Sequence, residues 1–310
     1  MKKSAKNRII VWSIVSGLLI AVLVLGIINI QHIGTFAVTP IKINNVRNLD
    51  DYVSGEAEFE RDKIVSLDVN WASGEINVSR GDTDKVVISE DSDSENVDDR
   101  MCWYLHNNGT LSIYSSKKSN VFFGLSFDKN KSKNLNIELP ANMSFDDLHI
   151  SSANADINVE FAIAEKVIVE NATGNIDIKG IESDNVDITN VSGRIDVTCE
   201  KAREVSVSSV SGQINVKGDY REIDTESVSG STNVYAGKDI MSIDSDAVSG
   251  SIDVSVSNEI SGFIAEYESV SGSFDCDFNG KSNVDEFVYG DGKVEINLET
   301  VSGSMSVKSI

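Results

Sequence analysis

Histidine, cysteine and proline are scarce in this sequence, which has 3 His, 3 Cys and 2 Pro among 310 residues. A mechanism that needs a cluster of imidazoles or thiolates therefore has few residues to use. The two prolines also exclude a collagen-like or proline-rich chain. Basic residues are the minority charge, with 27 Lys plus Arg against 49 Asp plus Glu. The formal charge of -22 would repel phosphates, so nucleic acid is not expected as a partner.

One long uncharged run lies near the N-terminus, from Ile9 to Ile30. A helix of this length would rise ~33 Å, which matches the hydrocarbon thickness of a bilayer. The flank before it, residues 1–8, carries four basic residues and no acid, so it is expected to stay in the cytoplasm as a short tail. The alternative is a cleaved signal peptide, whose apolar region is usually shorter. We expect a single-pass plasma-membrane anchor with an extracytoplasmic C-terminal domain.

The polar residues 31–62 follow this run without sustained periodicity and predict a linker between bilayer and domain. Without the four basic residues of the flank, 23 basic residues face 49 acidic ones. The exported part is therefore expected to be strongly anionic.

An internal repeat predicts the architecture of the remaining chain. The pattern Val-Ser-Gly followed by alternating apolar residues occurs six times, with glycines at Gly193, Gly212, Gly230, Gly250, Gly272 and Gly303. Two weaker copies are centred on Ala155 and Gly174, and a single early copy contains Gly74. From Ala155 the equivalent positions step by 19, 19, 19, 18, 20, 22 and 31 residues. A near-constant step of about 19 residues predicts stacked coils.

Apolar residues within each unit alternate with a period of two, which indicates strand, Ser-Gly turn, strand. One unit cannot bury its apolar row alone, but stacked units spaced ~4.8 Å apart can. The glycine column is expected either to need positive φ or to leave no room for a Cβ between coils. The predicted fold class is all-β, a β-solenoid of stacked coils preceded by one transmembrane helix.

Residues 151–310 are predicted to hold the regular repeats and residues 63–150 an irregular β portion that caps the stack. The last step is too long for one coil. The segment Tyr289-Gly290-Asp291-Gly292 has the composition of a hairpin turn, so a terminal hairpin is expected there, which could also cap the end.

These elements resemble those of the bacterial putative-adhesin family. The matching residues are Leu67-Asp68-Val69 with Ser73-Gly74, the strand from Leu135 to Pro140, the serial Val-Ser-Gly units, and the closing segment from Tyr289 to Gly303. The resemblance covers about 250 residues and implies a β-solenoid at the cell surface or in the envelope. It transfers no catalytic residues.

A column of Asp and Asn residues follows the turns, one per coil, and is predicted to face solvent: Asn158, Asp177, Asp196, Asn215, Asn233, Asp253 and Asp275. Two adjacent carboxylate pairs are expected, Asp177 with Asp196 and Asp253 with Asp275, and divalent cations could bridge them. The alternative, which we favour, is that the column keeps a flat β face soluble. No metal site or cofactor is predicted.

A dense acidic loop contains Glu90, Asp91, Asp93, Glu95, Asp98 and Asp99. It lacks the glycine and final glutamate of an EF-hand, so a solvated loop is expected. Cys199 and Cys276 are predicted to be buried thiols four coils apart, too distant for a disulfide. Cys102 with His106 falls short of a zinc site. His32 at the bilayer exit and His149 in a strand suggest no Ser/His/Asp triad.

One basic cluster is found in the exported part, at Lys117, Lys118, Lys129, Lys131 and Lys133, around the apolar run 121–125. This segment could dock on a partner or an anionic membrane, or it could be an ordinary strand or covering loop.

The sequence favours a non-catalytic, membrane-anchored interaction module, adhesive or structural, that binds an envelope polymer or a surface protein. An envelope-stress or regulatory accessory that captures cationic peptides or a membrane partner is the second hypothesis. A polysaccharide-acting enzyme ranks last, because turns of a few residues leave little chain to build a cleft.

Overall fold

The computed structural model describes residue 49 and residues 51–91, 96–117, 120–122, 125–127, 132–199 and 201–310. Residues 50–310 form one structural unit, and the description that follows concerns that unit. The expected membrane span, residues 9–30, lies outside the described residues. Among the described residues, none belongs to a helix of the length and apolarity that crossing a bilayer requires.

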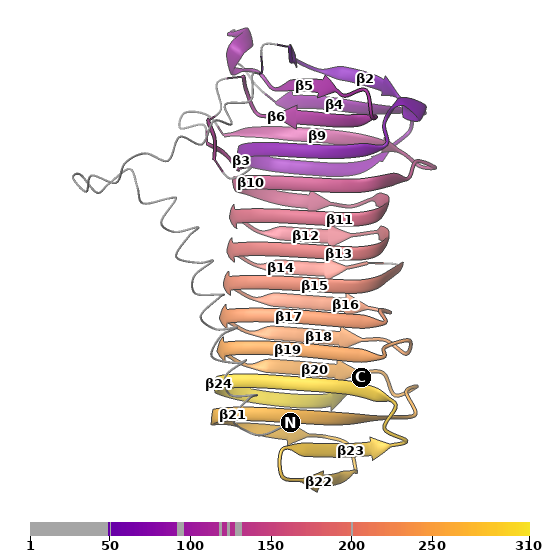
Figure 1. Cartoon of the computed structure of the whole chain (residues 1–310), viewed down its shortest axis with the longest axis vertical. Helices are drawn as coiled ribbons and strands as arrows, with labels where there is room; N and C mark the ends of the chain where they lie inside the picture. Colours follow the sequence, from indigo (N-terminus) through magenta and orange to yellow (C-terminus); the bar gives the residue numbers. More distant parts are fainter. Residues whose placement is uncertain are drawn as a thin grey trace, which may run out of the picture. The chain divides into compact units, whose positions relative to one another are not determined.

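Strands make up most of the described chain, and they stack one above the next (Figure 1). The N-terminal elements are β1 (Val53–Ser54), β2 (Ala57–Glu60), the 3-10 helix η1 (Arg61–Lys63), β3 (Ser66–Gly81), β4 (Lys85–Asp91), the 3-10 helix η2 (Val97–Asp99), β5 (Cys102–Leu105), β6 (Thr110–Tyr114), β7 (Asn120–Phe122), β8 (Leu125–Phe127) and β9 (Lys133–Pro140).

The regular coils are formed by β10 (Phe145–Val159), β11 (Ala162–Thr173), β12 (Ile176–Lys179), β13 (Ile181–Ser192), β14 (Ile195–Thr198), β15 (Lys201–Ser211), β16 (Ile214–Gly218), β17 (Glu222–Ser229), β18 (Thr232–Ala236), β19 (Ser242–Ser249) and β20 (Ile252–Val256). The last elements are β21 (Gly262–Cys276), β22 (Lys281–Asn283), β23 (Glu286–Gly290) and β24 (Val294–Ser309).

Each regular coil has two arms that meet at the turn glycine. The first arms, such as β13 and β15, pair in parallel with one another, and so do the second arms, such as β14 and β16. In β3, β10, β21 and β24 one continuous strand supplies both arms. The chain is therefore all-β and solenoid-like, as the repeat predicted.

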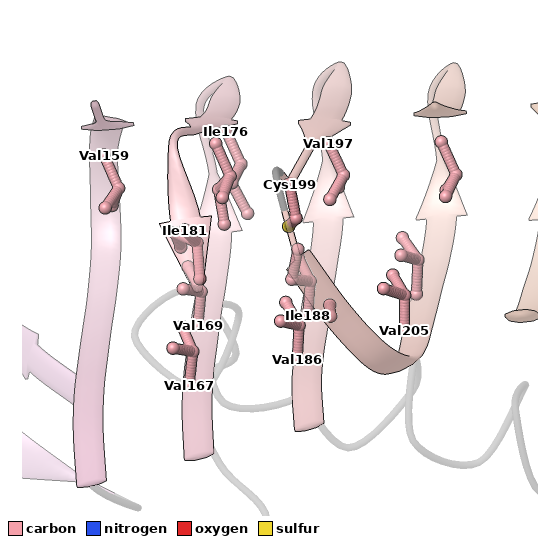
Figure 2. Close-up of a cluster of buried hydrophobic side chains, with 14 of the residues drawn as sticks. Val159, Val167, Val169, Ile176, Ile181, Val186, Ile188, Val197, Cys199 and Val205 are labelled. Atoms are coloured by element: carbon pink, nitrogen blue, oxygen red, sulfur yellow. The ribbon is translucent and has the colours of Figure 1, made fainter. Parts of the chain in front are cut away.

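The core is built from rows of like residues in register. Val167 pairs with Val186 and Val186 with Val205 on the first arms (Figure 2). On the second arms Ile176, Ile195 and Ile214 follow one another, each at most 1% exposed. Alternation sends these side chains inward on both arms, so each coil covers the apolar row of its neighbour.

Both explanations offered for the glycine column hold. Gly193 and Gly212 have φ of 133° and 151°, a region that residues with a Cβ rarely adopt. A Cβ on either would also lie 2.0 Å from the carbonyl oxygen of the glycine in the preceding coil. The turns therefore require glycine both for conformation and for space.

Order along the stack differs from order along the chain at both ends. The strand β3 lies between β10 on one side and β6 with β9 on the other, although β6 and β9 come later in the chain. At the other end β24 lies between β19 with β20 and β21, so the last coil in sequence is the penultimate one in space. The expectation that consecutive motifs stack on one another is wrong for the motifs of Gly250 and Gly272, because the motif of Gly303 lies between them.

Two predicted boundaries also change. The linker is shorter than residues 31–62, because β1 pairs with β5 and β2 with β4, and Phe59 packs edge-on against Trp103 at 4.8 Å. The inserted hairpin is β22 with β23 and turns at residues 284–285, and β23 pairs antiparallel with residues 262–266 of β21. The turn predicted at Tyr289–Gly292 is wrong as a hairpin, because these residues join β23 to β24, which pair with opposite sides of β21. The inserted hairpin accounts for the long final step of the repeat.

Candidate functional site

The predicted Asp/Asn column is real and extends further than the sequence indicated. We name it the amide ladder; in spatial order it comprises Asn136, Asn77, Asn158, Asp177, Asp196, Asn215, Asn233, Asp253, Ser306 and Asp275. Side-chain hydrogen bonds join many of the rungs. Asn158 donates to Asn77 at 3.0 Å, and Asn233 donates to Asn215 at 2.9 Å.

One of the two expected carboxylate pairs in the ladder is absent. Ser306 lies between Asp253 and Asp275 because β24 is inserted there, and its hydroxyl donates to Asp253 at 2.6 Å. Only Asp177 and Asp196 are direct neighbours.

Basic side chains already contact three of the four ladder carboxylates. Lys179 is 2.6 Å from Asp177, the Nε of Arg194 is 2.7 Å from Asp196, and Lys308 is 2.8 Å from Asp253. These contacts provide the positive charge for which the calcium hypothesis invoked a metal. Among the residues that the structure describes, no group of three or more His, Cys, Asp or Glu side chains is placed to hold a metal ion. The ladder therefore suits a soluble, hydrogen-bonded face better than a row of cation sites.

A second polar surface covers the outward side of the first arms and was not recognised from the sequence. Three rows of side chains cross successive strands there and contain no lysine or arginine between β13 and β21. We name it the acidic face; its carboxylates are Asp187, Glu204, Glu222, Asp224, Glu226, Asp244, Asp246, Glu266, Glu268, Glu295 and Glu299. Coils ~4.8 Å apart place these like charges close together.

Crowding on the acidic face changes its titration. Burial, with the charges of Glu299, Asp244, Glu226 and Asp224, raises the pKa of Asp246 to about 7. Burial and Glu226 similarly raise the pKa of Asp224 to about 6. The Oδ1 atom of Asp246 is buried and has no hydrogen-bond partner among the described residues. The face therefore carries unfavourable charge that a cationic ligand would relieve.

A third cluster, the His149 clamp, joins Asp68, His149, Ser151 and Glu170 across β3, β10 and β11. His149 Nδ1 lies 3.4 Å from Asp68, and Nε2 lies 3.3 Å from Glu170 and 3.0 Å from the hydroxyl of Ser151. The structure thus brings together a Ser, a His and an Asp that the sequence spacing did not connect.

The clamp does not have the electrostatics of a nucleophile and its base. Hydrogen bonds to Asp68 and Glu170 raise the pKa of His149 to about 9, so the imidazole already holds its proton at neutral pH. Ser151 is only 1% exposed, and its hydroxyl also donates to Glu170 at 3.3 Å. The hydrogen bond between His149 and Glu170 also lowers the pKa of Glu170. The arrangement suits an ionic link between three neighbouring strands.

The sequence profile of the Toastrack DUF4097 family matches residues 64–308. The chain belongs to the Toastrack DUF4097 family. This confirms the resemblance drawn from the Val-Ser-Gly units.

Three solved structures similar to this Toastrack chain share 14–15% identity with it. A "putative adhesin" from Bacteroides fragilis has a TM-score of 0.48 at 15% identity, covering 84% of this chain and 98% of that one. A "putative cell adhesion protein" from Clostridium sporogenes has a TM-score of 0.28 at 14% identity, covering 84% and 100%. A "putative lipid binding protein" from Parabacteroides distasonis has a TM-score of 0.48 at 14% identity, covering 82% and 96%. No curated protein matches the sequence.

The cysteines of the Toastrack domain are free thiols, and burial raises the pKa of Cys102 to about 12 and that of Cys199 to about 11. The predicted burial is correct for Cys199, while Cys276 is half-buried. Because β24 is inserted, five coil steps rather than four separate Cys199 from Cys276. His106 contacts the hydroxyl of Ser112 at 3.1 Å.

The predicted acidic loop and basic cluster are joined by a buried ion pair. Lys133 and Glu90 have side chains only 3% and 5% exposed, and Lys133 Nζ lies 3.4 Å from Glu90. The ammonium group also donates to the backbone oxygens of Ser115 and Asp99. Glu90 therefore does not belong to a solvated loop, nor Lys133 to a docking patch. Asp93, Glu95, Lys118, Lys129, Lys131 and His32 lie outside the described residues.

Residues 121, 122 and 125 of the apolar run belong to β7 and β8, which pair antiparallel with one another. The strand β8 lies close to β3 and β10, which agrees with the covering-strand interpretation. An open groove of about 610 Å³ follows the turns before the first arms. Its lining mixes both charges, with Glu182 and Lys201 3.2 Å apart.

Proposed function

We propose that this chain is a non-catalytic interaction module of the cell envelope, and that the acidic face binds an extended cationic ligand. The observation that carries the proposal is the set of three carboxylate rows on β13 to β21, whose positions hold no lysine or arginine. Arg203, beside the first row, lies 3.9 Å from Glu204. An extended polymer with cationic groups at regular intervals would meet one carboxylate after another along the stack.

The raised pKa values of Asp224 and Asp246 support this choice of ligand. Two neighbouring carboxylates destabilise each other, and a cation between them removes that repulsion. In the amide ladder, Lys or Arg side chains contact three of the four carboxylates and reduce such repulsion.

The chain is proposed to be anchored in the plasma membrane by residues 9–30, with the domain on the extracytoplasmic side. The uncharged run and the basic flank before it support this topology. The acidic face would then be presented to polymers and peptides of the envelope.

The test is a titration of the full chain with a fluorescent decalysine. The triple variant Glu222→Gln, Asp224→Asn, Glu226→Gln removes three carboxylates from β17 on the acidic face. The matched control Glu160→Gln, Glu165→Gln, Asp184→Asn removes three exposed carboxylates elsewhere.

Binding should weaken steeply with added salt, and the β17 variant should bind at least about tenfold more weakly than the control, from roughly 0.5 kcal/mol per lost ion pair. Equal losses in the two variants would mean that only net charge attracts the peptide. Affinity that does not change with salt would contradict the proposal.

A further inference from the structure

The strand β21 ends the stack with an edge that the described residues leave partly open. Its inner side pairs with β24 along Phe263–Cys276. On its outer side β23 pairs only with residues 262–266, and the amide of Tyr267 donates to Asp285. Residues 268–276, ~30 Å of strand, have no outward backbone partner among the described residues.

Apolar side chains are exposed along this edge. Val270, the valine of the Val-Ser-Gly motif, is 82% exposed, whereas the equivalent Val191 is 9% exposed. Phe274 stacks on Tyr267 with ring centroids 4.0 Å apart, and both rings are only half-buried. The residue in register with Phe274 in the next coil, Met305, is 2% exposed. The core is therefore left uncovered at this end.

Protein edges of this kind usually carry lysine, proline or charge that prevents strand pairing. The middle of the open edge, residues 269–274, carries none of these, and the two charges of the edge, Glu268 and Asp275, lie near its ends. The opposite end of the stack differs, because its outer strands are β1 and β2, only two and four residues long, and β2 carries the exposed charges of Glu58 and Glu60. Short, charged edges of this kind disfavour the addition of a further strand, so an open-ended fibre of solenoids is not expected.

We infer that the β21 edge joins two copies of this chain, strand to antiparallel strand about a twofold axis. The identical edge of a second copy presents the extended, uncharged segment that this edge needs, and each copy covers the open apolar end of the other. The charge distribution restricts where two copies can meet. With a formal charge of -22 on each chain, two copies repel one another over surfaces such as the acidic face, whereas the segment 269–274 brings no carboxylates into opposition.

Short edges bury little area, so the dimer should dissociate on the order of micromolar concentration. Screening of the like charges should strengthen it as salt is added. This is opposite to the salt dependence expected for a cationic ligand on the acidic face, so the two proposals can fail separately.

The experiment measures the mass of the full chain in density-matched detergent by sedimentation over a hundredfold concentration range, with amide hydrogen exchange of residues 268–276 on the same samples. We expect monomers to become dimers while exchange at this edge slows. Val270→Lys should shift the dissociation constant upward at least tenfold. The control Val53→Lys changes another exposed valine, which is 50% exposed and lies in β1 at the opposite end of the stack, and it should leave the dissociation constant unchanged.

Three outcomes would overturn the inference. A chain that stays monomeric with fast exchange at the edge has no partner there. A monomer whose edge amides are protected at every concentration is covered by its own residues 1–48. A dimer that persists in Val270→Lys uses another surface.

Discussion

The turn glycine of each coil satisfies two constraints with one residue. At Gly212 the backbone has φ of 151°, and the carbonyl oxygen of Gly193 occupies the position that a Cβ would need. We expect Gly212→Ala to destabilise the domain by about 2–4 kcal/mol, because neither the backbone oxygen nor the turn can move without unstacking a coil. Urea unfolding followed by circular dichroism measures the loss.

The neighbouring Ser211→Ala is the matched control, since Ser211 is exposed in the same motif. Its effect should stay within about 0.5 kcal/mol. Similar losses for the two variants would show that the turn tolerates a Cβ and that the glycine column has another cause.

Protonation of His149 should make the stability of the domain depend on pH. The pKa of His149 is raised to about 9 in the folded chain from an ordinary value near 6.5. Below pH 6.5 both folded and unfolded chains hold the proton, and the ion pairs with Asp68 and Glu170 contribute fully. As the pH rises through about 9, the folded chain loses the proton and this contribution disappears.

The side chain of His149 is 35% exposed, so solvent screening reduces the expected effect to about 1–2 kcal/mol. Urea unfolding at pH 6 and at pH 9.5 should show this difference for the native sequence and lose most of it in His149→Gln. The control His106→Gln replaces a histidine outside the clamp and should keep the difference. An unchanged pH dependence in His149→Gln would assign it to other groups.

At the scale of the strand, β17 and β19 concentrate like charge on the acidic face. The folded pKa of Asp246, about 7, lies above the value near 3.9 expected for an unfolded chain. Between these values the folded state binds more protons than the unfolded state, so stability falls as pH rises from about 4 to about 7. Asp246→Asn should therefore stabilise the domain by about 1 kcal/mol at pH 8 and have little effect at pH 4.5.

Thermal unfolding at both pH values measures this effect, with Asp184→Asn as an exposed carboxylate outside the acidic face. A stabilisation that appears equally in Asp184→Asn would reflect net charge alone. A loss of stability in Asp246→Asn at pH 8 would show that the carboxylate has a favourable partner.

The strands themselves were predictable from the sequence because burial on one side enforces alternation. The segment around Ile195 and Val197 shows this directly, and its register with Ile214 and Val216 follows from the 19-residue step. The acidic face was missed although its signal was present. In Glu222-Ile223-Asp224-Thr225-Glu226 the acidic residues alternate with the inward ones. The repeated Val-Ser-Gly motif begins after this segment and does not include it.

The His149 clamp could not be predicted in the same way. Asp68 precedes His149 by 81 residues, and the two meet only because β3 stacks on β10. The pairing of Glu90 with Lys133 has the same character, since β4 returns antiparallel to β9. Contacts between strands that are distant in sequence leave no periodic pattern in the local sequence, so they could not be predicted from it.

At the scale of the whole domain, the coils that contain β3 and β24 do not lie at the ends of the stack. The strand β3 is covered by β6 and β9, and β24 is covered by β21. The last strand in sequence is thus covered by an earlier one, which protects it from fraying, while the first strands, β1 and β2, pair on the outer side of β5 and β4. The repeat step of 31 residues corresponds in the sequence to the reversed stacking order of β21 and β24. A connection of this length allows the two strands to stack in either order.

Removal of β24 tests whether the inserted strand supports the end of the stack. In a chain that ends at Lys293, β21 loses its parallel partner, and limited proteolysis should cleave residues 257–293 while the coils of β10 to β20 stay protected, since each coil contacts only its neighbours. A chain that ends at Lys308 is the control and should resist cleavage at these sites. The opposite result is also informative, because Val270-Ser271-Gly272 in β21 has the same motif as the strand removed and could take its place in the stack. Continued protection of residues 262–276 would show that β21 docks directly on β19 and β20, and that the inserted order is not required for a closed stack.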